Sequence, residues 1–153
     1  MTKTNAQILA ATNLQGYLAL IQPEDSGRTA NSLMCEEDWY FDISNSIVFN
    51  PLETNTELKY TDKYSEIEDI IIDGTIIVLV WSEGGYEGGG DSASNVFGIF
   101  EVDALSNINP EPISYFMVNG FYSSYNGTEW NELDEWRFVK PTAKTVIDWV
   151  VSP

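Results

Sequence analysis

The feature that most constrains the fold is a pair of branched apolar runs joined by an Asp-Gly dipeptide. Glu68 to Ile72 precedes Asp73-Gly74, and Thr75 to Trp81 follows it. Both residues of a two-residue type I′ turn need a positive φ, which Asp and Gly tolerate better than branched residues do. The segment therefore predicts a tight β-hairpin, around which the chain builds an antiparallel sheet.

Further strands and turns are indicated on both sides of this hairpin. Asn119-Gly120, between Tyr115–Val118 and Phe121–Tyr125, predicts a second hairpin, and Asn126-Gly127 predicts a turn before Trp130. Other short runs of β-forming residues predict strands at 17–21, 39–43, 47–49, 96–102, 135–139 and 145–151.

The N-terminal segment predicts one helix over residues 5–15, with Asn5 as its N-cap and Gly16 as its C-cap. Residues 29–38 allow a single helical turn around Leu33-Met34. These elements predict one domain over 1–153 of the β-rich α+β class: a twisted antiparallel sheet or half-barrel with one N-terminal helix on one face. The expected core residues are Ile8, Leu9, Leu18, Leu20, Ile71, Ile76, Val78, Val80, Phe97, Ile99, Phe116, Val118, Val139, Val146 and Trp149.

Charge limits the possible partners. The chain has 24 Asp and Glu against seven Lys and Arg, for a formal net charge of −17. A small domain needs a magnitude of only roughly 2–8 for solubility. Nucleic acid and anionic membranes would both repel such a protein, so we expect it to bind neither directly. A cationic protein partner fits the charge better.

The absence of histidine limits the chemistry, because histidine is the commonest general base and metal ligand. The single cysteine, Cys35, precedes three acids that disfavour a thiolate, which makes it a packed or incidental residue. We therefore expect no catalytic residue, no cofactor and no metal, and a protein that is not an enzyme. One cysteine and no signal-peptide pattern at the N-terminus predict a reducing interior, the cytoplasm.

The segment from Ser82 to Asn95 contains five glycines. It lacks the Gly-Lys-Ser/Thr ending of a phosphate loop, and its acids would repel phosphate. Glu83, Glu87, Asp91 and Asn95 offer oxygen ligands for calcium, but their spacing does not match a twelve-residue calcium loop. A mobile hairpin loop is the favoured interpretation.

The acids fall into two clusters. Fourteen lie from Glu36 to Asp91, and a second group surrounds Trp130 and Trp136. In a strand, Glu66 and Glu68 share one face about 6.6–6.8 Å apart, which matches every second phosphate of a DNA strand at ~3.4 Å per phosphate. A solvated acidic face is the alternative interpretation. The candidate partner-binding residues are Glu66, Glu68, Asp69, Glu83, Glu87, Asp91, Glu129, Trp130, Glu132, Asp134 and Glu135.

Residues 96–151 resemble small acidic tailed-phage proteins of unassigned function. The resemblance lies in Phe97–Val102, in Gly-Phe-Tyr-Ser-Ser-Tyr-Asn-Gly at 120–127, and in Val139-Lys140-Pro141 followed by Lys144-Thr145-Val146. In that group a glycine-rich acidic loop precedes a strand, a G-Y-Y-S-S-Y-x-G hairpin and a closing strand. The resemblance implies a viral origin, and small acidic phage proteins often neutralise host nucleic-acid machinery.

The leading hypothesis is a non-catalytic phage-type inhibitor in the host cytoplasm. Its acids would mimic DNA phosphates in the basic, nucleic-acid-binding groove of a host protein, such as a restriction enzyme or CRISPR effector. The alternative is a structural or assembly module, a virion accessory or homo-oligomer that uses its aromatic surface. A carboxylate enzyme acting on sugars is a third hypothesis, which requires two acids facing each other across a concave aromatic cleft.

Overall fold

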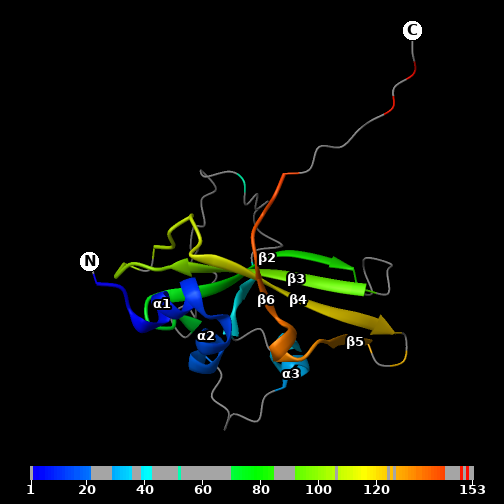
Figure 1. Ribbon diagram of the computed structural model, residues 1–153, viewed down its shortest axis with the longest axis horizontal. Coiled ribbons are helices and arrows are strands. Elements are labelled where there is room, and N and C mark those ends of the chain that lie inside the picture. Colours follow the sequence, from blue (N-terminus) through cyan, green and yellow to red (C-terminus); the bar gives the residue numbers. More distant parts are fainter. Residues whose placement is uncertain are drawn as a thin grey trace.

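The computed structural model describes residues 2–21, 29–35, 39–42, 52, 70–84, 92–105, 107–123, 125, 127–143, 149 and 151. In this described part of the chain, three short helices lie on one face of a twisted, six-stranded open sheet (Figure 1). The expected β-rich α+β class is confirmed. The elements are α1 Asn5–Thr12, α2 Leu14–Ile21, α3 Ala30–Cys35, β1 Phe41–Asp42, β2 Thr75–Gly84, β3 Ser92–Glu101, β4 Ser114–Ser123, β5 Gly127–Trp130, the 3₁₀ turn η5 Leu133–Glu135, and β6 Arg137–Val139.

The predicted helix over 5–15 is in fact two helices that meet at Asn13. Thr4, and not Asn5, caps α1: its hydroxyl accepts from the Gln7 N–H at 3.1 Å, and the Gln7 side chain accepts from the Thr4 N–H at 2.9 Å. Asn13 leaves the helical conformation with φ −148°, and its side chain then accepts from the Gly16 N–H at 2.9 Å. Asn13 therefore ends α1 and caps α2, so that Gly16 lies inside the second helix.

The strand predicted at 17–21 is wrong, because these residues belong to α2. Leu14, Tyr17 and Leu18 are its buried residues, at the i, i+3, i+4 spacing of a helix face. Tyr17 is fully buried, and its hydroxyl lies 2.9 Å from Thr75 Oγ1 at the start of β2. Burial raises the pKa of Tyr17 to about 12, and the hydrogen bond with Thr75 acts against this shift.

The sheet has the strand order β1-β2-β3-β4-β5, and β6 also pairs with β4. Every pairing is antiparallel except that of β1 with β2. Strand β5 pairs with residues 120–123 of β4, and β6 pairs with residues 115–117. The two short strands therefore share the edge of β4 that β3 leaves open.

The two predicted Asx-Gly hairpins have different outcomes. Asp73 and Gly74 have φ values of 52° and 78°, which confirms the turn into β2. Upstream of it, however, the described residues form only the bridge between Ile72 and Thr75. The hairpin at Asn119-Gly120 is wrong, because β4 continues through both residues. The turn predicted at 126–127 is confirmed by Gly127, with φ 70°, at the start of β5.

Gly120 has a packing role. A Cβ at this position would lie 2.7 Å from the Glu129 carbonyl oxygen and 2.9 Å from Trp130 Cε3. The missing side chain thus lets β5 and the Trp130 ring lie directly against β4.

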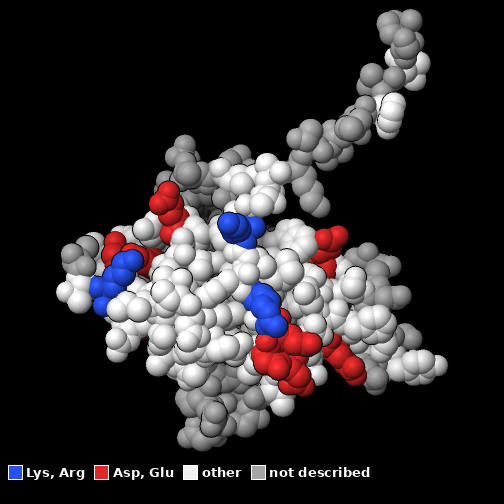
Figure 2. Space-filling model, in the orientation of Figure 1, with Lys and Arg blue, Asp and Glu red and all other residues white. Residues whose placement is uncertain are grey.

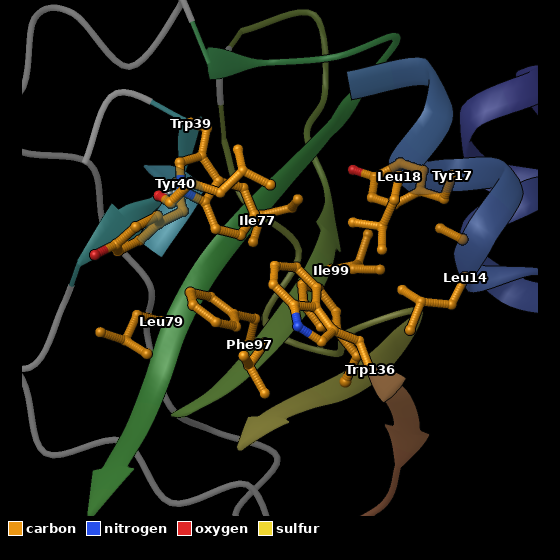
Figure 3. Packing of buried hydrophobic residues seen from close by; sticks show 14 of the residues in the cluster. Leu14, Tyr17, Leu18, Trp39, Tyr40, Ile77, Leu79, Phe97, Ile99 and Trp136 are labelled. Atoms are coloured by element: carbon orange, nitrogen blue, oxygen red, sulfur yellow. Dashed lines mark hydrogen bonds between the residues drawn. The ribbon is translucent and has the colours of Figure 1, made fainter. Parts of the chain in front are cut away.

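Most of the core lies between the helices and the sheet. Figure 3 shows Phe97, Trp136 and Leu14 pointing into this common space. Three expected core residues are instead exposed: Ile8 is 47%, Leu20 46% and Trp149 93% accessible. Val146 lies outside the described residues, and Leu9, Ile71, Val80 and Val139 are half-buried. The remaining expected residues are buried, namely Leu18, Ile76, Val78, Phe97, Ile99, Phe116 and Val118.

The other expected elements are shorter than predicted or lie outside the described residues. The strand expected at 39–43 is β1, residues 41–42 alone, and that at 135–139 is β6, with Glu135 in η5. The strand expected at 47–49 lies outside the described residues, as does most of 145–151. None of the helices seen is long and apolar enough to cross a membrane.

Candidate protein-interaction surface

Five of the eleven candidate residues, Glu66, Glu68, Asp69, Glu87 and Asp91, lie outside the described part of the chain. Of the other six, Glu83 lies near the end of β2. The remaining five lie between residues 129 and 135, in β5, η5 and the two residues that join them. We call the four carboxylates of this segment the acidic edge: Glu129, Glu132, Asp134 and Glu135.

The acidic edge is displayed by a turn whose apolar residues point inward. Leu133 packs against the main core and Trp136 is 1% exposed, whereas Glu132, Asp134 and Glu135 are exposed. The Gln15 side chain also donates a hydrogen bond to the Leu133 carbonyl at 2.9 Å, which ties the turn to α2. The acids are therefore held outward by the burial of their neighbours.

Trp136 is the main anchor of this turn. Its ring stacks on Phe116 at a centroid distance of 5.8 Å and on Trp39 at 6.2 Å. Its indole Nε1 donates to the Asn131 carbonyl at 3.0 Å, and its backbone N–H donates to the Leu133 carbonyl at 3.2 Å. Residues 131–136 are thus fixed at both ends by one buried side chain.

The neighbouring Arg137 does not engage the carboxylates of this turn. The Arg137 guanidinium, although adjacent, donates to the backbone carbonyls of Asp134 and Trp136. Within the described ranges, no carboxylate of the acidic edge forms an ion pair or accepts a hydrogen bond. Figure 2 shows acidic side chains gathered where η5 lies in Figure 1, with a basic side chain directly above them.

Trp130 does not lie among the exposed acids as its position in the sequence suggested. It packs against the main core, and its backbone N–H donates to the Asn31 side chain of α3 at 2.5 Å. Because Trp130 pairs with Gly120, both residues are on the helix-covered face of the sheet. The two tryptophans of this segment therefore support the turn from within.

An aromatic residue that sequence reasoning missed lies beside the acids. Phe121 is 56% exposed and pairs with Glu129 on the face opposite the helices. It was missed because Asn119-Gly120 indicated a turn at this point. The alternation of Tyr115, Met117, Asn119 and Phe121 along one continuous strand is the signal that identifies its face.

Glu83 shares this face and this end of the sheet. Glu83 pairs with Ser94 of β3. Glu129 pairs with Phe121 of β4, and Phe121 pairs in turn with Ser92, which is two residues before Ser94 in β3. Three strand spacings of about 4.8 Å place β2 and β5 about 14 Å apart. Glu83 and Glu129 therefore lie on opposite sides of one exposed sheet surface.

The described residues contain no group of three or more His, Cys, Asp or Glu side chains that could hold a metal ion. Cys35 is exposed at the end of α3. Comparison of the chain with protein-family models, with curated proteins and with solved structures finds no match.

Proposed function

We propose that this protein is a non-catalytic inhibitor that inserts its acidic edge into a basic, nucleic-acid-binding groove of a host protein. The observation that carries the proposal is the display of four carboxylates within seven residues, one in β5 and three on the turn that buried Trp136 and half-buried Leu133 hold in place. The Arg and Lys side chains of such a groove normally contact phosphates, and carboxylates present the same charge-assisted hydrogen-bond acceptors.

The fixed turn supports tight binding. Ordering a flexible acidic tail in a groove costs roughly 0.5–1.5 kcal/mol for each immobilised side chain, besides the entropy of its backbone. Here the backbone of residues 131–136 is already ordered by the Trp136 hydrogen bonds and the Gln15 contact. Phe121 adds an exposed aromatic ring next to Glu129, the kind of residue on which interface affinity concentrates.

The net charge of −17 supports the proposal through its effect on association. A strongly negative protein is steered toward a positive groove, which raises the association rate at low ionic strength. Screening over about 8–10 Å at 0.1–0.15 M salt then weakens the steering. Restriction enzymes and CRISPR effectors are suitable targets, because each has a groove that holds nucleic acid.

The proposal is tested by displacement of labelled duplex DNA from such enzymes, followed by fluorescence anisotropy. Asp134→Asn with Glu135→Gln removes two charges of the acidic edge, and Glu101→Gln with Glu111→Gln removes two at the opposite end of the sheet. We expect the first pair to weaken displacement at least about tenfold, since a desolvated charged hydrogen bond is worth roughly 1.5–3 kcal/mol.

The control variant, Glu101→Gln with Glu111→Gln, should displace DNA within about twofold of wild type, because it changes only the long-range charge and no contact in the groove. Equal losses in both pairs would show that only net charge matters and would remove the acidic edge from the interface. Direct binding of the protein to the target without DNA should weaken between low and physiological salt, and binding that does not weaken would contradict the whole proposal.

A further inference from the structure

A row of apolar side chains crosses the face of the sheet that the helices leave open. Trp81 pairs with Val96, and Val96 pairs with Met117, so the three lie side by side on β2, β3 and β4. Val96 and Met117 are next in sequence to residues of the opposite face, namely Phe97, Phe116 and Val118, which belong to the main core. We call Trp81, Val96 and Met117 the apolar row.

A β-bulge brings Trp81 into this row. The register between β2 and β3 shifts between Leu79 and Trp81, so that Val80 and Trp81 together oppose Val96. Val80 packs against the small cluster of Ile76, Val78 and Phe100 on this same face, whereas Trp81 remains 45% exposed. The bulge therefore places a large aromatic side chain on the open face, where the described helices give it no cover.

A second group of apolar side chains without cover lies in the C-terminal segment, residues 140–153. Trp149 is 93% and Val151 97% exposed. The segment carries Lys140 and Lys144 against the single acid Asp148, although the chain as a whole has a charge of −17. It is therefore both apolar and attracted to the acidic body of the protein.

We propose that the C-terminal segment of one copy of this protein docks on the apolar row of a second copy, and that the exchange is reciprocal. Trp149 and Val151 would cover Trp81 and Met117. Lys140 and Lys144 would lie near Glu83 and Glu129, which border the row on the same face. A two-fold arrangement gives each row and each C-terminal segment one partner. This interface shares only Glu129 with the acidic edge and does not depend on its function.

The direction of β6 favours a second copy over the segment's own sheet. Arg137 pairs with Met117 and Val139 pairs with Tyr115, so β6 runs away from the level of the row. Pro141 has a fixed φ and disfavours the helical conformation at Lys140, so Lys140 favours continuing the extended conformation of β6. Ten residues separate Val139 from Trp149, a reach of at most about 33–36 Å, which is enough to meet a neighbouring molecule.

Salt distinguishes this contact from the acidic-edge interaction. Two copies of charge −17 repel each other, so screening strengthens an apolar contact between them. We therefore expect dimers to increase with both protein and salt concentration, whereas binding to a basic groove weakens with salt. Failure of one proposal leaves the other intact.

The first test is size-exclusion chromatography with light scattering, at low and high salt and over a range of protein concentrations. Trp149→Ser with Val151→Ser removes the apolar side chains of the C-terminal segment, and Trp81→Ser removes the largest side chain of the apolar row. Each variant alone should be monomeric. An equal mixture of the two should regain dimers, because the intact C-terminal segment of the Trp81→Ser protein can then dock on the intact apolar row of the other variant. Leu105→Ser, which also removes an exposed apolar side chain (81% accessible), should dimerise as wild type.

The second test follows the methionine methyl groups by NMR after ¹³C-methyl labelling. Met117 lies in the row, and Met34 is buried on the other face as an internal reference. The Met117 methyl signal should shift upfield with protein concentration through the ring current of Trp149, and the Trp149→Ser, Val151→Ser protein should lose the shift. A wild-type monomer under all conditions, dimers that survive both variants, or a Met117 shift independent of concentration would each overturn the proposal.

Discussion

Truncation of Trp136 is expected to destabilise the fold more than loss of any exposed tryptophan. The side chain is 1% exposed and stacks on both Phe116 and Trp39. It also holds residues 131–136 through its bond to the Asn131 carbonyl. Trp136→Ala therefore removes part of the core and the anchor of the acidic edge together.

The magnitude follows from the buried area. A buried tryptophan covers about 150–250 Å², which at about 25 cal/mol per Å² corresponds to roughly 4–6 kcal/mol. Measured losses for Trp→Ala in protein cores are about 3–5 kcal/mol, and we expect a value in that range. Trp136→Phe keeps a ring against Phe116 and loses mainly the indole hydrogen bond and part of the volume. We expect it to cost about 1–2 kcal/mol.

Urea unfolding followed by far-UV circular dichroism measures these differences without relying on tryptophan fluorescence. Trp149→Ala is the matched control, because the same side chain is 93% exposed there. At a protein concentration low enough for the wild type to be monomeric, its free energy of unfolding should stay within about 0.5 kcal/mol of wild type. Similar losses for Trp136→Ala and Trp149→Ala would refute the assignment of Trp136 as the core anchor.

Three further predictions concern single residues of the fold. Burial raises the pKa of Tyr17 to about 12, so the Tyr17 hydroxyl loses its proton at lower pH in the unfolded chain than in the folded one. The contribution of this side chain to the free energy of unfolding is therefore fully present below pH 10 and falls between pH 10 and 12. At 1.36 kcal/mol per pKa unit, the wild type should lose about 2–3 kcal/mol of stability between pH 10 and 12. The urea midpoint of Tyr17→Phe should fall less than that of the wild type over the same pH range. Gly120→Ala should cost about 1–3 kcal/mol by forcing β5 off β4, seen as faster amide exchange at Glu129, whereas Asn119→Ala should leave that exchange unchanged. Thr4→Ala should lower the free energy of unfolding by about 1 kcal/mol, because the α1 cap and the 2.8 Å bond to the Asp73 carbonyl are both lost; an unchanged urea midpoint would contradict this cap assignment.

The turn dipeptides show what the sequence can predict locally. Asp73-Gly74 and Asn119-Gly120 have the same turn propensity, but only the first adopts positive φ values. At the second, pairing with β3 on one side and with β5 on the other continues through both residues. The deciding factor is the Trp130 ring over Gly120, a contact between residues ten apart that no dipeptide preference contains.

The helical region and the candidate surface show the same limit. Residues 17–21 combine strand-favouring Tyr and Ile with helix-favouring Leu and Ala, so their propensity does not decide between strand and helix. The packing decides it, because Leu14, Tyr17 and Leu18 together form a helix face that packs on the sheet. The grouping of acids at 129–135 was visible in the sequence. Which of their neighbours point inward depends on the register of β5 with β4 and on burial of Trp136, and both are tertiary properties.

Among the described strands, β1 pairs with β2 in parallel, and this has a consequence for the order of folding. Strands β2, β3 and β4 follow one another in the chain and pair as an antiparallel meander, whereas β1 and β2 are far apart in the sequence, Asp42 and Thr75 being their nearest ends. The entropy of closing a loop grows with its length, at about 0.6 kcal/mol for each doubling. We therefore expect the meander to form first and the two residues of β1 to join it last.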